Sequence, residues 1–237
     1  MRKRLVRGPE DIADLIGRLG FLPFFRNEIR GFSLEEHTPP ELWWNEEDDI
    51  WPCWEWKGEV ISLANCGYGK YAFAKMCFVS EEWFPDFRNY RISRRRITED
   101  EALVLETLRG EDSLLTKELK SLAGYGREER RISEFSGGLE AGAGPAIRPV
   151  RREGFDTVLS HLQRDCRVTI SGFEYAVDRY GNRYGWGIAR YTTPESFFGG
   201  RALDVPRTPE ESRERILGKL RSDFPRASLR ALERFAG

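Results

Sequence analysis

Glu55 is the carboxylate in this sequence best placed for chemistry, because it stands between Trp54 and Trp56. A carboxyl group beside aromatic rings can act as a general acid or base. The alternation over residues 54–61 predicts a strand with both rings on one side and Glu55 on the other. A surface ion pair with Lys57 is therefore the competing interpretation of this catalytic candidate.

Two other patterns suggest catalysis without completing a known motif. His37 and His161 are the two histidines of the sequence, and neither lies in a recognisable nucleophile motif. Residues 67–70, Gly-Tyr-Gly-Lys, resemble part of a phosphate-binding loop but lack its full spacing and the Ser or Thr after the lysine. We predict a turn at residues 67–70.

The cysteines predict neither a metal centre nor a disulfide framework. They stand at positions 53, 66, 77 and 166 without a Cys-x-x-Cys pair, and two histidines add few ligands. Cys77 and Cys166 fall in apolar patterns and are predicted to be small core residues. We expect reduced thiols in a cytoplasmic protein, with no metal and no cofactor.

Length and charge narrow the class of protein. The 237 residues can bury a substantial core, and no run of about eighteen apolar residues predicts a membrane span. The formal charge of −1 excludes a uniformly basic protein. Charge is nevertheless uneven, with five arginines and no acid over residues 88–96 and seven acids but no Lys or Arg over residues 35–49. Each run is either a binding surface or a solvated face.

The N-terminal part, residues 1–96, is rich in aromatic side chains. Apolar residues at helical spacing predict a helix over residues 9–20. Aromatic residues are dense over 21–92, which is typical of a core built from large rings. The C-terminal tail, residues 194–237, is predicted to pack back as two helices, one starting after Thr208 and one at Pro225.

The middle part, residues 97–193, predicts a winged helix-turn-helix module. Thr98 and Glu101 form a capping box before the first helix, and Thr116 caps the second. A Gly-, Arg- and Glu-rich stretch over 126–152 predicts a flexible insert. An apolar stripe predicts a third helix over 154–166, and alternating runs around a Gly-Asn tip predict a hairpin over 168–191. The expected fold class is α+β, mainly α.

Double-stranded DNA is the expected partner of such a module. Its third helix would place outward side chains in the major groove, and its hairpin would reach phosphates or the minor groove. Asp156 and Asp165 on the third helix would repel phosphate. The expected DNA-binding residues are Arg94, Arg95, Arg96, Thr157, Ser160, His161, Arg164, Arg179, Tyr180 and Arg183.

The whole chain resembles the AlkZ-like winged-helix DNA glycosylases (azinomycin-resistance and crosslink-repair proteins), and in particular their small bacterial AlkZ-related group. The resemblance lies in three stretches: LIGRLGFL at 15–22, CFVSEEWFPDFR at 77–88, and the passage 114–191. It implies a scaffold that grips DNA and stacks an extruded base. Phe25, Trp54 and Trp56 are the candidates for stacking.

The catalytic motif that the resemblance implies is missing. Active relatives carry Gln-x-Gln or Gln-x-Asp where this sequence has Pro23 and Phe25, and a His-Glu pair where it has Ala74 and Lys75. Those polar groups position the attacking water and stabilise the electron-poor sugar. The sequence therefore predicts a DNA-binding relative of the glycosylases without their usual chemistry.

Two alternatives stay open from the sequence alone. One is an active glycosylase for alkylated or crosslinked bases that uses another acid, with Glu55 the first to test. The other is a protein-interaction module without nucleic acid, whose acidic 35–49 segment meets a basic partner. The sequence does not identify a protein partner.

Overall fold

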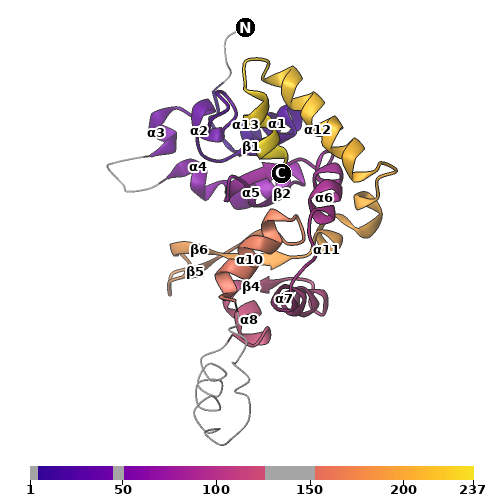
Figure 1. The fold of residues 1–237 in the computed structure, drawn as a ribbon. Helices are drawn as coiled ribbons and strands as arrows, with labels where there is room; N and C mark the ends of the chain where they lie inside the picture. Colours follow the sequence, from indigo (N-terminus) through magenta and orange to yellow (C-terminus); the bar gives the residue numbers. More distant parts are fainter. Residues whose placement is uncertain (1–4, 45–50, 126–152) are drawn as a thin grey trace, which may run out of the picture.

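A computed structural model describes residues 5–44, 51–125 and 153–237 of a mixed α+β chain (Figure 1). The predicted insert 126–152, and residues 45–50 of the acidic segment, lie outside the described residues. The described part holds two three-stranded antiparallel sheets, ordered β1-β3-β2 and β4-β6-β5. None of the helices in these ranges is both long and apolar enough to cross a membrane.

The first sheet pairs β1 (Phe21–Pro23) and β2 (Gly67–Ala72) with the central strand β3 (Lys75–Val79). The turn predicted at residues 67–70 is therefore wrong, because these residues begin β2. Gly67 is required there by packing: a Cβ at this position would lie 2.4 Å from the Phe84 ring. The local Gly-x-Gly pattern reflects close contact with an aromatic core.

The strand predicted over residues 54–61 is also wrong. Helices α4 (Pro52–Glu55) and α5 (Lys57–Ala64) occupy this stretch. Proline suits the first turn of a helix, and the buried residues of α5 are spaced three and four apart, which is a helical period. The alternation of rings and charges is too short to outweigh these signals.

The helix predicted over residues 9–20 is confirmed as α1 (Pro9–Leu19), which buries the apolar stripe of Ile12, Leu15, Ile16 and Leu19. Short helices α2 (Leu34–His37) and α3 (Pro40–Trp43) follow β1. Helix α6 (Phe84–Ser93) follows β3 and leads into the middle part of the chain. All four cysteines are buried and unpaired, so Cys77 and Cys166 are core residues as predicted.

The middle part follows the predicted order of helices and hairpin. It contains α7 (Glu99–Arg109), β4 (Leu114–Leu115), α8 (Thr116–Leu122), α10 (Phe155–Arg164), β5 (Thr169–Val177) and β6 (Arg183–Thr192). The capping box of Thr98 and Glu101 is present, and β5 pairs with β6 around the expected tip. Leu115, one residue earlier than predicted, occupies the N-cap position of α8.

The tail packs on the first sheet. It contains α11 (Pro194–Phe198), a 3₁₀ turn η1 (Gly200–Leu203), α12 (Pro209–Asp223) and α13 (Leu229–Ala236). The predicted capping box of Thr208 is confirmed, but α13 is capped by Ser228, so its predicted start at Pro225 is wrong. Phe235 of α13 stacks on Phe87 of α6, and Figure 1 shows the yellow tail running beside α6.

A buried carboxylate fastens α12 to α6. Asp86 on α6 is fully buried and accepts hydrogen bonds from Arg207, Ser212 and Arg215. Burial alone would raise the pKa of Asp86, but the hydrogen bonds from Arg207 and Ser212 outweigh it and hold the pKa below its ordinary value. The charged form of Asp86 therefore stabilises the packing of the tail.

Replacing Asp86 with Asn should lower the free energy of unfolding at pH 7 by about 2 kcal/mol, because two arginines lose their anionic partner. Since the folded pKa lies below the ordinary value of 3.8, this stabilisation is present above that pH and is lost as the pH falls through the folded pKa. Urea unfolding at pH 7 and pH 3 measures both effects.

Asp204→Asn, at an exposed position beyond η1, is the matched control and should leave stability unchanged. A cost for Asp86→Asn that is as small as the control's at pH 7, or that grows at pH 3, would contradict this account of the tail.

Candidate nucleic-acid interface

Arg91 on α6 joins three segments that are distant in sequence. Its buried guanidinium donates to the carbonyl oxygens of Tyr71 at 2.6 Å, Arg164 at 2.8 Å, Phe235 at 2.6 Å and Ala236 at 3.2 Å. Burial lowers its pKa. A single side chain thereby holds strand β2, helix α10 and helix α13 together. The four carbonyl oxygens accept from the N–H groups of its planar guanidinium.

A basic cleft of about 560 Å³ lies beside Arg91. Five arginines line it, and Asp165 is the acid among its described lining residues. The lining comprises Tyr71, Phe73, Ala74, Arg91, Arg94, Arg95, Arg164, Asp165, Arg234 and Gly237. The arginines come from α6, α10, α13 and the segment between α6 and α7, so the cleft exists only in the folded chain.

Two further hollows share lining residues with this cleft. One, of about 240 Å³, shares Phe73 and Arg234 with it and is also lined by Pro23, Phe25 and Lys75. The other shares Arg94 and Arg95 and adds Arg96 and Arg167. We call the three hollows together the basic groove.

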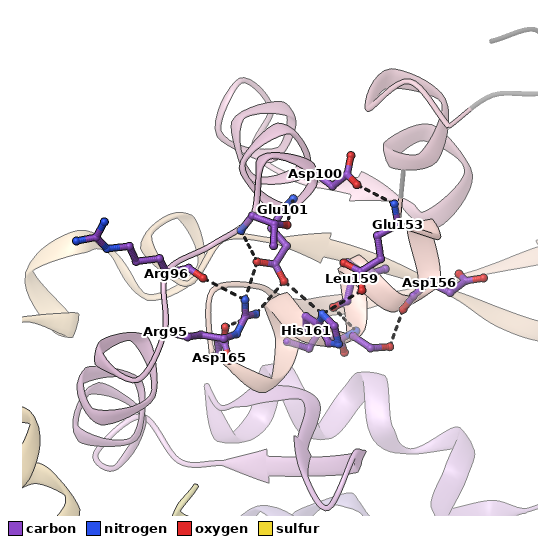
Figure 2. Close-up of polar contacts among 12 residues, drawn as sticks. Arg95, Arg96, Asp100, Glu101, Glu153, Asp156, Leu159, His161 and Asp165 are labelled. Atoms are coloured by element: carbon purple, nitrogen blue, oxygen red, sulfur yellow. Dashed lines mark hydrogen bonds and ion pairs between the residues drawn. The ribbon is translucent and has the colours of Figure 1, made fainter. Parts of the chain in front are cut away.

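The three consecutive arginines predicted to bind DNA differ in their surroundings. Arg94 and Arg96 are exposed at the groove. Arg95 instead donates a hydrogen bond of 2.8 Å from each terminal guanidinium nitrogen to Glu101 and also pairs with Asp165 (Figure 2). Arg95 is therefore held by protein acids, whereas the side chain of Arg96 points away from them.

Helix α10 presents some of its predicted DNA-binding residues to solvent and engages others internally. Thr157 and Arg164 are exposed. Ser160 accepts a hydrogen bond from Lys70 Nζ at 3.0 Å, and the Nδ1 atom of His161 lies 3.4 Å from Glu101. Sequence spacing places all four on one helix face, but strand β2 and helix α7 cover the middle of that face.

The tip of the hairpin is exposed as its polar sequence suggested. Arg179 lies over the Tyr180 ring at 4.7 Å, and Tyr180 is 72% exposed. The neighbouring Tyr184 and Trp186 are 59% and 66% exposed and were missed from the sequence. The alternation of Tyr184 and Trp186 with glycines was the available signal, since it leaves large rings on one face of β6.

The three candidates for stacking a base pack against one core cluster, and the ring centroids of Phe25 and Trp54 lie 6.4 Å apart, but only Phe25 is among the described residues that line the groove. Phe25 lines the groove, with Lys75 Nζ 5.7 Å from its ring. Trp54 packs edge-on against Phe24, and both Trp54 and Trp56 are half-buried beside the N-terminal core. Neither tryptophan is among the described residues that line the groove.

Glu55 also lies away from the basic groove. It is exposed on α4 and accepts a hydrogen bond from the Tyr175 hydroxyl, and burial together with this negative charge raises the pKa of Tyr175 to about 12. The expected partner Lys57 is buried between the rings of Trp54 and Phe173, and burial lowers its pKa to about 8. These contacts attach the hairpin to α4 and α5.

The four positions at which the sequence was expected to lack a catalytic motif lie at the basic groove. Pro23 ends β1 and Phe25 follows it, while Ala74 lies in the turn between β2 and β3 and Lys75 begins β3. Ala74 lines the basic cleft, and the other three line the hollow of about 240 Å³. Phe73 and Ala74 both have positive φ, of 51° and 58°. Such values strain residues other than glycine, and they turn the Phe73 ring toward Arg234 in the groove wall.

Fold and groove together define an α+β protein in which arginines from several segments line three hollows that share residues, beside a helix–hairpin unit. The chain belongs to the AlkZ-related family, because the family model described as "AlkZ related" matches residues 6–237. No curated protein matches the sequence.

Among solved structures, the chain is similar to the Streptomyces sahachiroi DNA glycosylase AlkZ, with 12% sequence identity and a TM-score of 0.47. The comparison covers 99% of this chain and 60% of the glycosylase. The chain therefore spans about three fifths of the length of that protein.

Replacing Arg91 with Lys should lower the free energy of unfolding by about 3 kcal/mol, because an ammonium group cannot reach four carbonyl oxygens spread around a planar guanidinium. Arg94→Lys, at an exposed position three residues away, is the matched control and should change stability little. Equal urea midpoints for the two variants would show that the carbonyl contacts of Arg91 do not hold the groove together.

Proposed function

We propose that residues 97–193 form a winged-helix module and that the chain binds double-stranded DNA along the basic groove. The observation that carries this proposal is that three hollows, which share lining residues, are lined by nine arginines and lysines and by two acids, Glu28 and Asp165, among the described residues. A concave surface with such an excess of one sign of charge focuses its field on a polyanion. Membership of the AlkZ-related family supports the same partner.

In this proposal the phosphate contacts come from exposed arginines along the groove and on the hairpin. Arg94, Arg96 and Arg164 lie at the groove, and Arg179 and Arg183 lie at the exposed tip. Arg91 and Arg95 are positioning residues, because their guanidinium groups are bound to carbonyls and to acids within the protein. Phosphate contacts supply affinity and orientation without reading sequence.

We infer further that the chain lacks the usual glycosylase chemistry. The side chains of Pro23, Phe25 and Ala74 offer no hydrogen bond to an attacking water. Lys75 adds a cation, which opposes the positive charge that develops on the sugar. Glu55 hydrogen bonds to Tyr175 outside the groove, so it is unsuited to replace the missing groups.

DNA affinity should fall steeply with salt, because each phosphate contact on duplex DNA contributes about −0.9 to the slope of log affinity against log salt concentration. Changing Arg96 and Arg164 together to Ala should weaken binding on all sequences and flatten the slope by about 1.8. Fluorescence anisotropy with a labelled duplex at several salt concentrations measures both.

Arg221→Ala with Arg226→Ala is the control, since these exposed residues of the tail do not line the groove. A flat salt response, absence of binding, or an equal effect of the control pair would reject DNA binding along this surface.

An alkylated duplex incubated with excess protein should accumulate no abasic sites, because the positions of the catalytic motif hold no water-orienting group. Alkaline cleavage followed by gel electrophoresis detects such sites. Base release above the level of a protein-free control would restore the alternative of an active glycosylase.

A further inference from the structure

His161 on α10 faces two carboxylates from other segments of the chain. Its Nδ1 atom lies 3.4 Å from Glu101 Oε1 at the start of α7 and 3.6 Å from Glu153 Oε1 just before α10 (Figure 2). All three atoms lie within 4.8 Å of one another. Two ligands of a tetrahedral zinc ion with bonds of about 2.0–2.1 Å lie roughly 3.3 Å apart, so these separations suit a shared metal.

The protein orients the Glu101 carboxylate from behind and holds the backbone of Glu153 in place. Both oxygens of Glu101 accept from the Arg95 guanidinium, and one also accepts from the backbone N–H of Thr98. The backbone N–H of Glu153 donates to Asp100, which fixes the start of α10. Hydrogen bonds of this kind orient the ligands of metal sites in proteins.

The three side chains differ in exposure to solvent, as is typical of a metal site that keeps one coordination position open to water. The Glu101 side chain is fully buried, whereas those of His161 and Glu153 are 28% and 35% exposed. A cation could enter from the side of His161 and Glu153 and keep a water molecule as its remaining ligand.

Charge favours a cation at this position. The carboxylates of Glu101 and Glu153 both face the His161 ring, while Arg95 binds Glu101 and Asp165 from the other side. A neutral imidazole adds a nitrogen ligand, which Zn²⁺ and similar transition metals accept and which Mg²⁺ and Ca²⁺ do not favour. The donor set of one nitrogen and two oxygens selects the transition metals.

We propose that Glu101, Glu153 and His161 bind a divalent transition-metal ion of the Zn²⁺ class. The ion joins the start of α7 to the start of α10 and so fixes two helices of the proposed winged-helix module. His161 then serves the module as a metal ligand instead of contacting DNA. The sequence did not indicate this site, because Glu101 lies about fifty residues before the other two ligands and the set follows no short metal-binding spacing.

The competing arrangement is an ion pair, in which a protonated His161 lies between Glu101 and Glu153 with no metal. The two differ in proton balance, because a metal binds neutral imidazole and displaces the proton that the histidine carries at low pH. Metal affinity should therefore fall as the pH is lowered, because protons compete with the metal for the ligand atoms.

Isothermal titration calorimetry of the full chain, freed of metal with a chelator, tests the proposal. We expect Zn²⁺ to bind with a stoichiometry of one, to raise the melting temperature and to release protons on binding at acidic pH, while Mg²⁺ at the same concentration has none of these effects. Glu153→Gln keeps the shape of the side chain and His161→Ala removes the nitrogen ligand, and each should weaken Zn²⁺ binding at least about tenfold.

Glu106→Gln, an exposed position on the same module, is the matched control and should bind Zn²⁺ as the wild type does. Failure of Zn²⁺ to bind the wild-type chain would overturn the proposal in favour of the ion pair. Equal Zn²⁺ affinity in the wild type, Glu153→Gln and His161→Ala would overturn it by placing the ion elsewhere. None of these measurements uses DNA, so they stand apart from the test of DNA binding.

Discussion

The arrangement around the basic groove depends on the buried guanidinium of Arg91. A guanidinium without an anionic partner is costly to bury unless its N–H groups are satisfied, and here carbonyl oxygens of β2, α10 and α13 satisfy them. These segments must therefore meet at one point. Their meeting brings Arg164 and Arg234 to the same cleft as Arg94, which no single segment could achieve.

Most acids near the groove are bound within the protein, although Glu28 lines one hollow and pairs with Arg234, so arginines still outnumber acids along the groove. Asp165 and Glu101 pair with Arg95, and Asp86 pairs with Arg207 and Arg215 on the other side of α6. The chain thus combines a formal charge of −1 with a strongly basic surface. Local charge decides whether a polyanion is attracted, whereas total charge describes solubility.

The sequence predicted those elements whose apolar pattern is long and regular. Helices α1 and α10 carry four or more stripe residues at helical spacing, and the hairpin of β5 and β6 carries alternation on both sides of a turn. The strand predicted at 54–61 was wrong, because a few alternating rings fit a strand as well as a buried helix. The turn predicted at 67–70 was wrong, because Gly67 is required by the close approach of the Phe84 ring and not by a turn.

For the candidate sites, the sequence predicted which single residues are exposed but not which residues contact one another. Arg94, Arg96, Arg164, Arg179 and Arg183 are exposed as expected, but the sequence could not tell that Arg95 and His161 are engaged with acids from other segments. Such contacts arise from tertiary packing over tens of residues. Hydrogen–deuterium exchange with and without duplex DNA tests the central claim most directly: DNA should protect residues 91–97, 164–167 and 179–186 and leave α12 unchanged. Protection of α12 without protection of these segments would contradict it.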